Sequence, residues 1–152
     1  MKKILLFLGV SVLILSCSKQ GENQITDYLA QTVWTCNDDT FPGTIKFLGN
    51  GKAVYTPSYT VSMNGKTSTI ASKEEFEGTY RIIDERKIAL DFFISLTLPA
   101  ELSYLSAGMR LGDIYLTEAT YSLTTMTVIG KFIGSGDFGL KDKDLSLIYK
   151  KN

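Results

Sequence analysis

Residues Arg86 to Leu98 have the sequence Arg-Lys-Ile-Ala-Leu-Asp-Phe-Phe-Ile-Ser-Leu-Thr-Leu, in which apolar side chains occupy every second position from Ile88 onward. Successive side chains of a β-strand point to opposite faces of a sheet. One face of this stretch therefore carries an unbroken apolar series: Ile88, Leu90, Phe92, Ile94, Leu96 and Leu98. The other face is largely polar: Lys87, Ala89, Asp91, Phe93, Ser95 and Thr97. The stretch predicts a strand with one face in a hydrophobic core and the other in water.

The rest of the chain from Thr32 onward shows the same strand chemistry. Short segments rich in β-branched and aromatic residues alternate with turns rich in glycine and asparagine. Strands are expected at 32–36, 44–48, 52–59, 60–63, 66–71, 75–83, 86–98, 112–123, 125–133 and 144–150. The strongest turn signal is Asn64-Gly65, because both residues tolerate the positive φ of a type I′ hairpin. Pro57 indicates an edge or a bend in its strand, and a helical turn is expected only at 25–30.

These features predict an all-β fold. Antiparallel strands with one dry face must protect two unpaired sheet edges, and a closed barrel or a two-sheet sandwich does so. The expected architecture is an antiparallel up-and-down meander of about eight to ten strands that closes into a barrel. A β-sandwich is the alternative, in which Pro99 to Leu111 would be the long crossing connection.

The composition excludes several classes of function. The chain has 152 residues, with 16 basic and 16 acidic side chains and no histidine. A balanced charge provides no basic field for nucleic acid, so no nucleic-acid partner is expected. Without histidine the commonest general base and metal ligand are missing, and we expect no enzyme, no metal and no cofactor. A minor alternative is carboxylate catalysis by residues such as Glu74, Glu75 and Glu77.

The N-terminus has the pattern of an export signal. Lys2 and Lys3 precede an apolar run of about twelve residues, Ile4 to Leu15, which is too short for a membrane span of about twenty. The run ends in Ile14-Leu15-Ser16-Cys17, which resembles the lipobox of bacterial lipoproteins. The resemblance implies cleavage before Cys17 and lipidation of its thiol. The expected organisation is a signal peptide (1–16), a lipidated tether (17–24) and a single β-barrel domain (25–152).

Lipidation would place the protein in the cell envelope. Ser18 follows the cysteine, and in such lipoproteins an aspartate there tends to retain the protein on the inner membrane, so the resemblance implies the outer membrane. The expected partner is thus the membrane, through the N-terminal lipid anchor, with its periplasmic or surface face left open. The other cysteine, Cys36, has no histidine to activate it and is interpreted as a buried small apolar residue.

Four segments of the body resemble the small lipocalin-like (calycin) lipoproteins. They are Trp34 in the first strand, Ile45-Lys46-Phe47 with the turn Gly49-Asn50-Gly51, Gly78-Thr79-Tyr80-Arg81-Ile82, and the closing Leu145-Ser146-Leu147-Ile148-Tyr149-Lys150-Lys151. The resemblance implies a cavity for a small apolar molecule. The residues expected to line it are Trp34, Phe47, Tyr80, Leu90, Phe92 and Ile94, and the alternative for all six is a plain core.

Pro99 to Leu111 interrupts the strand pattern and has short amphipathic character. It is interpreted as a lid over the barrel mouth that contacts a ligand through Leu102, Tyr104, Leu105 and Met109, or as a plug that completes the core. Two functions remain open. One is an envelope module that binds a small hydrophobic ligand, and the other is a filled-core lipoprotein that docks onto another envelope protein.

Overall fold

A computed structural model of the chain describes residues 27–152 except 64, 98–108 and 137–138, and describes 61–63, 66–68 and 71 by their backbone alone. Nine strands form: β1 (Val33–Cys36), β2 (Gly43–Gly49), β3 (Lys52–Met63), β4 (Lys66–Ala71), β5 (Phe76–Asp84), β6 (Lys87–Thr97), β7 (Arg110–Tyr121), β8 (Thr125–Gly134) and β9 (Lys143–Lys151). None of the described residues lies in an α-helix, and none belongs to a helix long and apolar enough to cross a bilayer.

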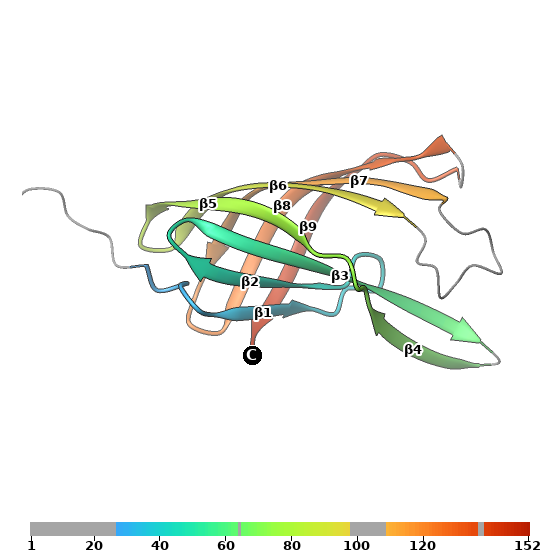
Figure 1. Ribbon diagram of the computed structural model, residues 1–152, viewed down its shortest axis with the longest axis horizontal. Helices are drawn as coiled ribbons and strands as arrows, with labels where there is room; N and C mark the ends of the chain where they lie inside the picture. Colours follow the sequence, from blue (N-terminus) through green and yellow to red (C-terminus); the bar gives the residue numbers. More distant parts are fainter. Residues whose placement is uncertain (1–26, 64, 98–108, 137–138) are drawn as a thin grey trace, which may run out of the picture.

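Eight of these strands close into an antiparallel barrel, as the sequence predicts. The order of neighbours is β2-β1-β9-β8-β7-β6-β5-β3, and β3 pairs back with β2 to close the circle. From β5 to β9 each strand pairs with the next, and β1 then lies between β9 and β2. Closure removes the sheet edges that a sandwich would leave, and the barrel is the architecture seen (Figure 1).

The ninth strand, β4, is an extra strand outside the barrel. The first half of β3 pairs with β2 and β5, and its second half pairs with β4, from Ser58 opposite Ala71 to Met63 opposite Lys66. The predicted hairpin around Gly65 is confirmed, and Asn64 lies outside the described residues. This hairpin projects beyond one end of the barrel (Figure 1).

The expectation of two strands, 52–59 and 60–63, is wrong, because β3 runs unbroken through Pro57. Proline lacks the N–H group that a central strand needs. Pro57 lies, however, at the point where β3 changes its neighbour from β5 to β4. Pairing with β5 ends at Tyr55 and pairing with β4 begins at Ser58. On this side of β3 Pro57 therefore falls between the two ladders, while on the other side it lies opposite Gly43 of β2.

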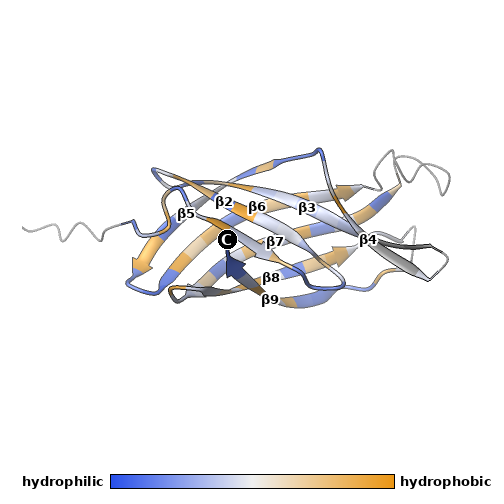
Figure 2. Cartoon of the chain, turned by 90° about the horizontal axis from the view of Figure 1, so that it is seen from below, coloured by the Kyte–Doolittle hydropathy of each residue, from blue (hydrophilic) through white to orange (hydrophobic). Residues whose placement is uncertain are grey.

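The barrel interior is filled by the inward-facing side chains of all eight barrel strands. In β6 the predicted alternation is confirmed, since Ile88, Leu90, Phe92, Ile94 and Leu96 are all buried, whereas Leu98 lies outside the described residues. Figure 2 shows apolar and polar segments alternating along the strands. Such burial of one residue in two is the main stabilising term of this fold.

One end of the barrel is closed by the turn that precedes β1. Residues 28–31 form this turn. The sequence predicts a helical turn at 25–30, of which residues 27–30 are described, and the structure has a turn there. Leu29 enters the barrel end and is 1% exposed. The carboxylate of Asp27 accepts the N–H groups of Leu29 and Ala30, both at 3.1 Å, and so fixes the turn. The opposite end, next to β4, is called the mouth.

Candidate functional site

A cavity of about 440 Å³ lies at the mouth of the barrel. Its walls come from the segment between β1 and β2, from β3, from the mouth ends of β6, β7 and β8, and from the segment that leads into β9. The apolar and aromatic lining consists of Phe41, Pro42, Tyr55, Pro57, Tyr59, Leu96, Leu111, Ile114, Phe132 and Leu140. This volume and lining fall in the range typical of small-molecule sites.

Tyr55 of β3 forms the inner part of the cavity and is 1% exposed. Its ring lies directly on the backbone of Gly43 in the neighbouring strand β2, where an added Cβ atom would stand 2.5 Å from the Tyr55 hydroxyl oxygen. Only glycine allows this approach. The Tyr55 hydroxyl group points to the carbonyl oxygen of Pro42, 3.5 Å away, which is a weak hydrogen bond at best.

A second buried tyrosine, Tyr149 of β9, lies beside Tyr55 and the thiol of Cys36. Its side chain is 0% exposed, and no hydrogen bond of ordinary length and angle reaches its hydroxyl group among the described residues. Burial raises the pKa of Tyr149 and of Tyr55 well above the ordinary value of a tyrosine. Both phenols are neutral at pH 7, as an ordinary tyrosine is, and can donate a hydrogen bond.

Cys36 is a free cysteine, and its thiol is buried. Burial raises its pKa, and the negative charge of Asp38 acts in the same direction. The thiolate is the reactive form of cysteine, so this thiol is poorly suited to nucleophilic chemistry. Its position agrees with the sequence-based interpretation of a small apolar core residue.

An aromatic pair forms one side of the cavity. The rings of Phe41 and Phe132 lie 4.9 Å apart between centroids at an angle of 48°. Phe41 is held inward by the carboxylate of Asp38, which accepts the N–H groups of Thr40 at 2.8 Å and of Phe41 at 3.0 Å. A local turn thus directs a phenylalanine from an otherwise polar segment into the barrel mouth.

Tyr59 spans the side of the mouth where β5 and β6 separate. The register of β5 with β6 ends at Thr79 opposite Asp91, so the mouth half of β6 has no partner on that side in the described chain. The Tyr59 hydroxyl group donates a hydrogen bond of 3.0 Å to the carbonyl oxygen of Thr97, at the end of β6. This bond ties the β3 wall of the cavity to the β6 wall.

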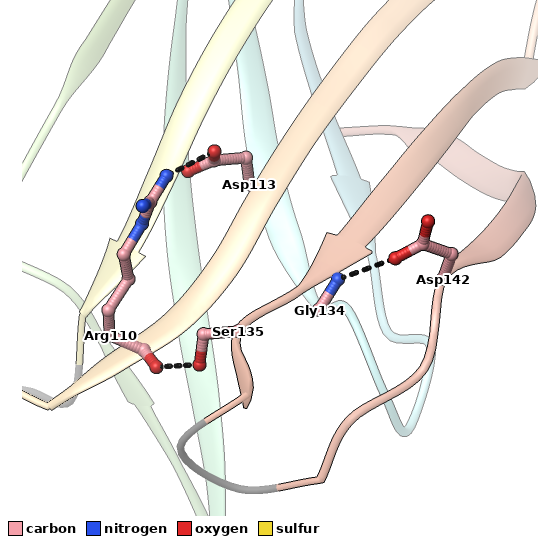
Figure 3. Close-up of polar contacts among 5 residues, drawn as sticks. All are labelled: Arg110, Asp113, Gly134, Ser135 and Asp142. Atoms are coloured by element: carbon pink, nitrogen blue, oxygen red, sulfur yellow. Dashed lines mark hydrogen bonds and ion pairs between the residues drawn. The ribbon is translucent and has the colours of Figure 1, made fainter.

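Polar contacts hold the segment between β8 and β9 against the mouth (Figure 3). The hydroxyl group of Ser135 donates to the carbonyl oxygen of Arg110, and the Ser135 N–H donates to that of Leu111 at 3.1 Å. Gly134 donates its N–H to the carboxylate of Asp142 at 3.2 Å. These contacts place Leu140 and its neighbours over the cavity.

The rim of the cavity is charged and exposed. Lys141 lies on the segment before β9, Lys143 is the first residue of β9, and Asp39 lies on the segment before β2. Beside the rim, the guanidinium group of Arg110 forms an ion pair with the carboxylate of Asp113, which is 8% exposed (Figure 3). A ligand in the cavity would contact apolar walls inside. At the rim it would meet the two ammonium groups of Lys141 and Lys143 and the single carboxylate of Asp39.

The six residues that the sequence suggested as cavity lining lie deeper in the barrel. Trp34, Phe47, Tyr80, Leu90, Phe92 and Ile94 are between 0% and 6% exposed, and none borders the mouth cavity. Phe47 and Tyr80 pack edge to face with centroids 4.9 Å apart, and the Trp34 indole N–H donates to the Thr32 hydroxyl group at 2.8 Å. They form part of the buried core, and a ligand contact for them stays a prediction.

The proposed lid falls mostly outside the described residues. Leu102, Tyr104 and Leu105 cannot be placed, and Met109 is half-buried at the start of the described part. Two residues further on, Leu111 borders the cavity. Sequence reasoning missed Phe41 and Tyr55, although the apolar pair Phe41-Pro42 directly after the polar segment 37–40 was a usable signal.

Comparison with known proteins provides no relative. No protein-family model matches the chain, and neither a curated protein sequence nor a solved structure matches it significantly.

Proposed function

We propose that this protein is a lipid-anchored component of a bacterial cell envelope whose barrel binds a small apolar molecule at its mouth. The observation that carries the proposal is the cavity of about 440 Å³, enclosed by apolar and aromatic side chains at one end of a closed barrel. A barrel of about eight strands has an interior just filled by side chains or wide enough for one small ligand. Here the deep interior is filled, and the space lies at the mouth.

The lining indicates a ligand with an apolar body and at least one polar group. The wall of the cavity includes Tyr55, whose hydroxyl group makes only a weak bond to the carbonyl oxygen of Pro42. The outer rim offers the ammonium groups of Lys141 and Lys143. A few polar groups in an otherwise apolar pocket typically fix the orientation of a small molecule.

The envelope location and the lipocalin-like character rest on the sequence. Ile14-Leu15-Ser16-Cys17 resembles a lipobox, and Ser18 after the cysteine favours the outer membrane. The lipocalin-like resemblance is compatible with the meander and with the turn before β1 that closes one barrel end. We also propose that the protein binds its ligand without catalysing a reaction.

The test is native mass spectrometry of the mature, full-length protein purified in detergent from its own host, followed by denaturing extraction. A hydrophobic compound retained at one molecule per chain is the expected result. The variant Leu111→Trp should lose this compound because the indole fills the cavity, whereas Leu123→Trp, in the turn between β7 and β8, should retain it. An empty wild-type protein, or equal retention by both variants, would contradict the proposal.

A second candidate function is docking onto another envelope protein. It is favoured by the outer wall of the barrel, where Phe93 and Tyr115 lie 5.1 Å apart between ring centroids and are 52% and 38% exposed. Exposed aromatic pairs of this kind are common in protein interfaces. A photo-crosslinking residue at Phe93 should then capture one defined envelope protein, and the same residue at Asp91 on the same face serves as control.

A further inference from the structure

Exposed apolar side chains mark the closed end of the barrel, opposite the mouth. Tyr28 is 66% exposed, Leu48 38%, Ile83 42% and Leu123 89%. Tyr28 lies in the turn before β1 and Leu123 in the β7–β8 turn, while Leu48 and Ile83 lie at the ends of β2 and β5, next to the β2–β3 and β5–β6 turns. A single exposed apolar side chain is ordinary, whereas several at one end of a molecule can mark an interaction site.

Hydrogen bonds between these connections show that they form one end of the molecule. Gln31, in the turn before β1, donates its side-chain N–H to the carbonyl oxygen of Leu48 at 2.6 Å. Tyr121, at the start of the β7–β8 turn, donates its N–H to the carbonyl oxygen of Arg86 in the β5–β6 turn at 2.9 Å. The four apolar side chains therefore lie on one end of the barrel.

The chain enters the barrel at this same end. Asp27 is tied to Tyr80 of β5 and caps the turn that carries Tyr28. From Cys17 to Asp27 there are ten peptide units, which span at most about 33–36 Å when fully extended. A lipid group on Cys17 would hold the closed end within that distance of the bilayer.

The charge of the closed end also suits a bilayer surface. The turns at this end, counted together with the strand ends beside them (27–33, 48–52, 83–87, 122–125 and 150–152), contain five basic and three acidic residues, and one of the basic residues, Lys87, forms an ion pair with Glu118 of β7. The chain after Cys17, by contrast, has 14 basic and 16 acidic residues, because two of the 16 basic residues are Lys2 and Lys3. The closed end is thus weakly basic in a mildly acidic protein, and anionic lipid headgroups attract a basic surface.

We propose that the closed end docks onto the lipid bilayer, with Leu123 and Tyr28 inserted at the interface and the mouth cavity directed away from the membrane. The inference rests on the proposed lipid anchor. Leucine and tyrosine at exposed turn tips are residues that interfacial insertion favours. In this orientation the mouth exchanges its ligand with the aqueous compartment and not with the lipid on which the protein stands.

The test is tryptophan fluorescence in vesicles that carry the full-length, lipidated protein. The native tryptophan, Trp34, is 1% exposed, and its fluorescence is a constant background. Measurement of the wild-type protein gives this background, which is subtracted from the signal of each variant. Leu123→Trp places a probe at the closed end. Ile148→Trp is the matched control, because Ile148 is 62% exposed on the outer wall. The vesicles contain phosphatidylethanolamine and phosphatidylglycerol, with or without brominated acyl chains.

The expected result is quenching of Leu123→Trp by brominated lipid about three-fold stronger than that of Ile148→Trp, since inserted side chains lie roughly 5–10 Å into the interface. Leu123→Trp should also be shielded from aqueous iodide. Equal lipid quenching of the two probes, or full access of iodide to Leu123→Trp in vesicle-bound protein, would overturn the docking. Protein that does not float with the vesicles would overturn the lipid anchor and the docking with it. Flotation of the protein thus distinguishes failure of the lipid anchor from failure of the docking alone.

Discussion

The hydroxyl group of Tyr80 in β5 donates a hydrogen bond to the carboxylate of Asp27, 53 positions earlier in the chain. The same carboxylate accepts the N–H groups of Leu29 and Ala30. One side chain thus joins the turn that closes the barrel to the barrel wall. Removal of Asp27 leaves two backbone donors and one phenol without their acceptor.

We expect Asp27→Ala to lower the free energy of unfolding by about 2–3 kcal/mol, because hydrogen bonds to a charged group are worth roughly 1.5–3 kcal/mol. Tyr80→Phe should cost about 1–2 kcal/mol, since it removes one of those bonds. Urea denaturation of both single variants and of the double variant measures the coupling. Additive effects would show that the bond between the two side chains contributes nothing, and the exposed Asp91→Asn is the control.

Gly43→Ala tests the inner end of the cavity. The new Cβ atom would stand 2.5 Å from the hydroxyl oxygen of Tyr55, so the tyrosine must move, at a cost of about 1–3 kcal/mol. Gly136→Ala is the matched control, because no atom lies within 4 Å of its added Cβ. Tyr55→Leu combined with Gly43→Ala should cost less than the sum of the two changes. Denaturation midpoints that are the same for Gly43→Ala and Gly136→Ala would contradict the packing.

Alkaline pH should destabilise the protein through its buried phenols. In the unfolded chain Tyr55 and Tyr149 lose their protons near pH 10, whereas burial raises both pKa values in the folded barrel. Above about pH 10 the unfolded state therefore binds fewer protons, and the free energy of unfolding falls by about 1.4 kcal/mol per pH unit for each phenol.

Tyr149→Phe should remove about 1.4 kcal/mol per pH unit from that alkaline slope. At pH 7 it should leave the free energy of unfolding unchanged or raise it by about 1 kcal/mol, because the lost hydroxyl group, which lies beside that of Tyr55, receives no hydrogen bond of ordinary length and angle from the described residues. Urea denaturation of variant and wild type between pH 8 and pH 11 measures both effects. A large loss at pH 7 would mean that this hydroxyl group is hydrogen-bonded after all.

Cys17→Ala should move the protein from the membrane fraction to the soluble fraction, because the proposed acyl chains are attached to this thiol. Cell fractionation and immunoblotting measure the distribution. Cys36→Ala is the matched control: its thiol is buried in the barrel, so this variant should stay with the membrane. Membrane association that survives the loss of Cys17 would contradict the lipid anchor.

The strand pattern was predictable because each strand carries its own signal. Period-two alternation in β6 and the Gly65 turn depend on local side-chain and backbone preferences alone. The continuity of β3 through Pro57 was not predictable. It depends on which neighbours lie on each side of the strand, and only the assembled sheet decides that.

The cavity residues were harder to predict than the fold. Trp34, Phe47 and Phe92 have the same inward orientation as Leu96 and Ile114, and the sequence contains nothing that distinguishes a core position from a cavity wall. The difference is the height of each residue along the barrel. That height follows from strand register, which is set by contacts between segments far apart in the chain.

The sequence by itself determined the all-β class, the number of strands within narrow limits and which face of each strand is dry, since these follow from alternation and turn chemistry. Tertiary structure alone decided how the strands close, where empty space remains and which turns share an end. Barrel closure brings β1 between β9 and β2, directs Phe41 and Tyr55 into the mouth and gathers Tyr28 and Leu123 at the other end. Those positions depend on long-range pairing, which local preference does not encode.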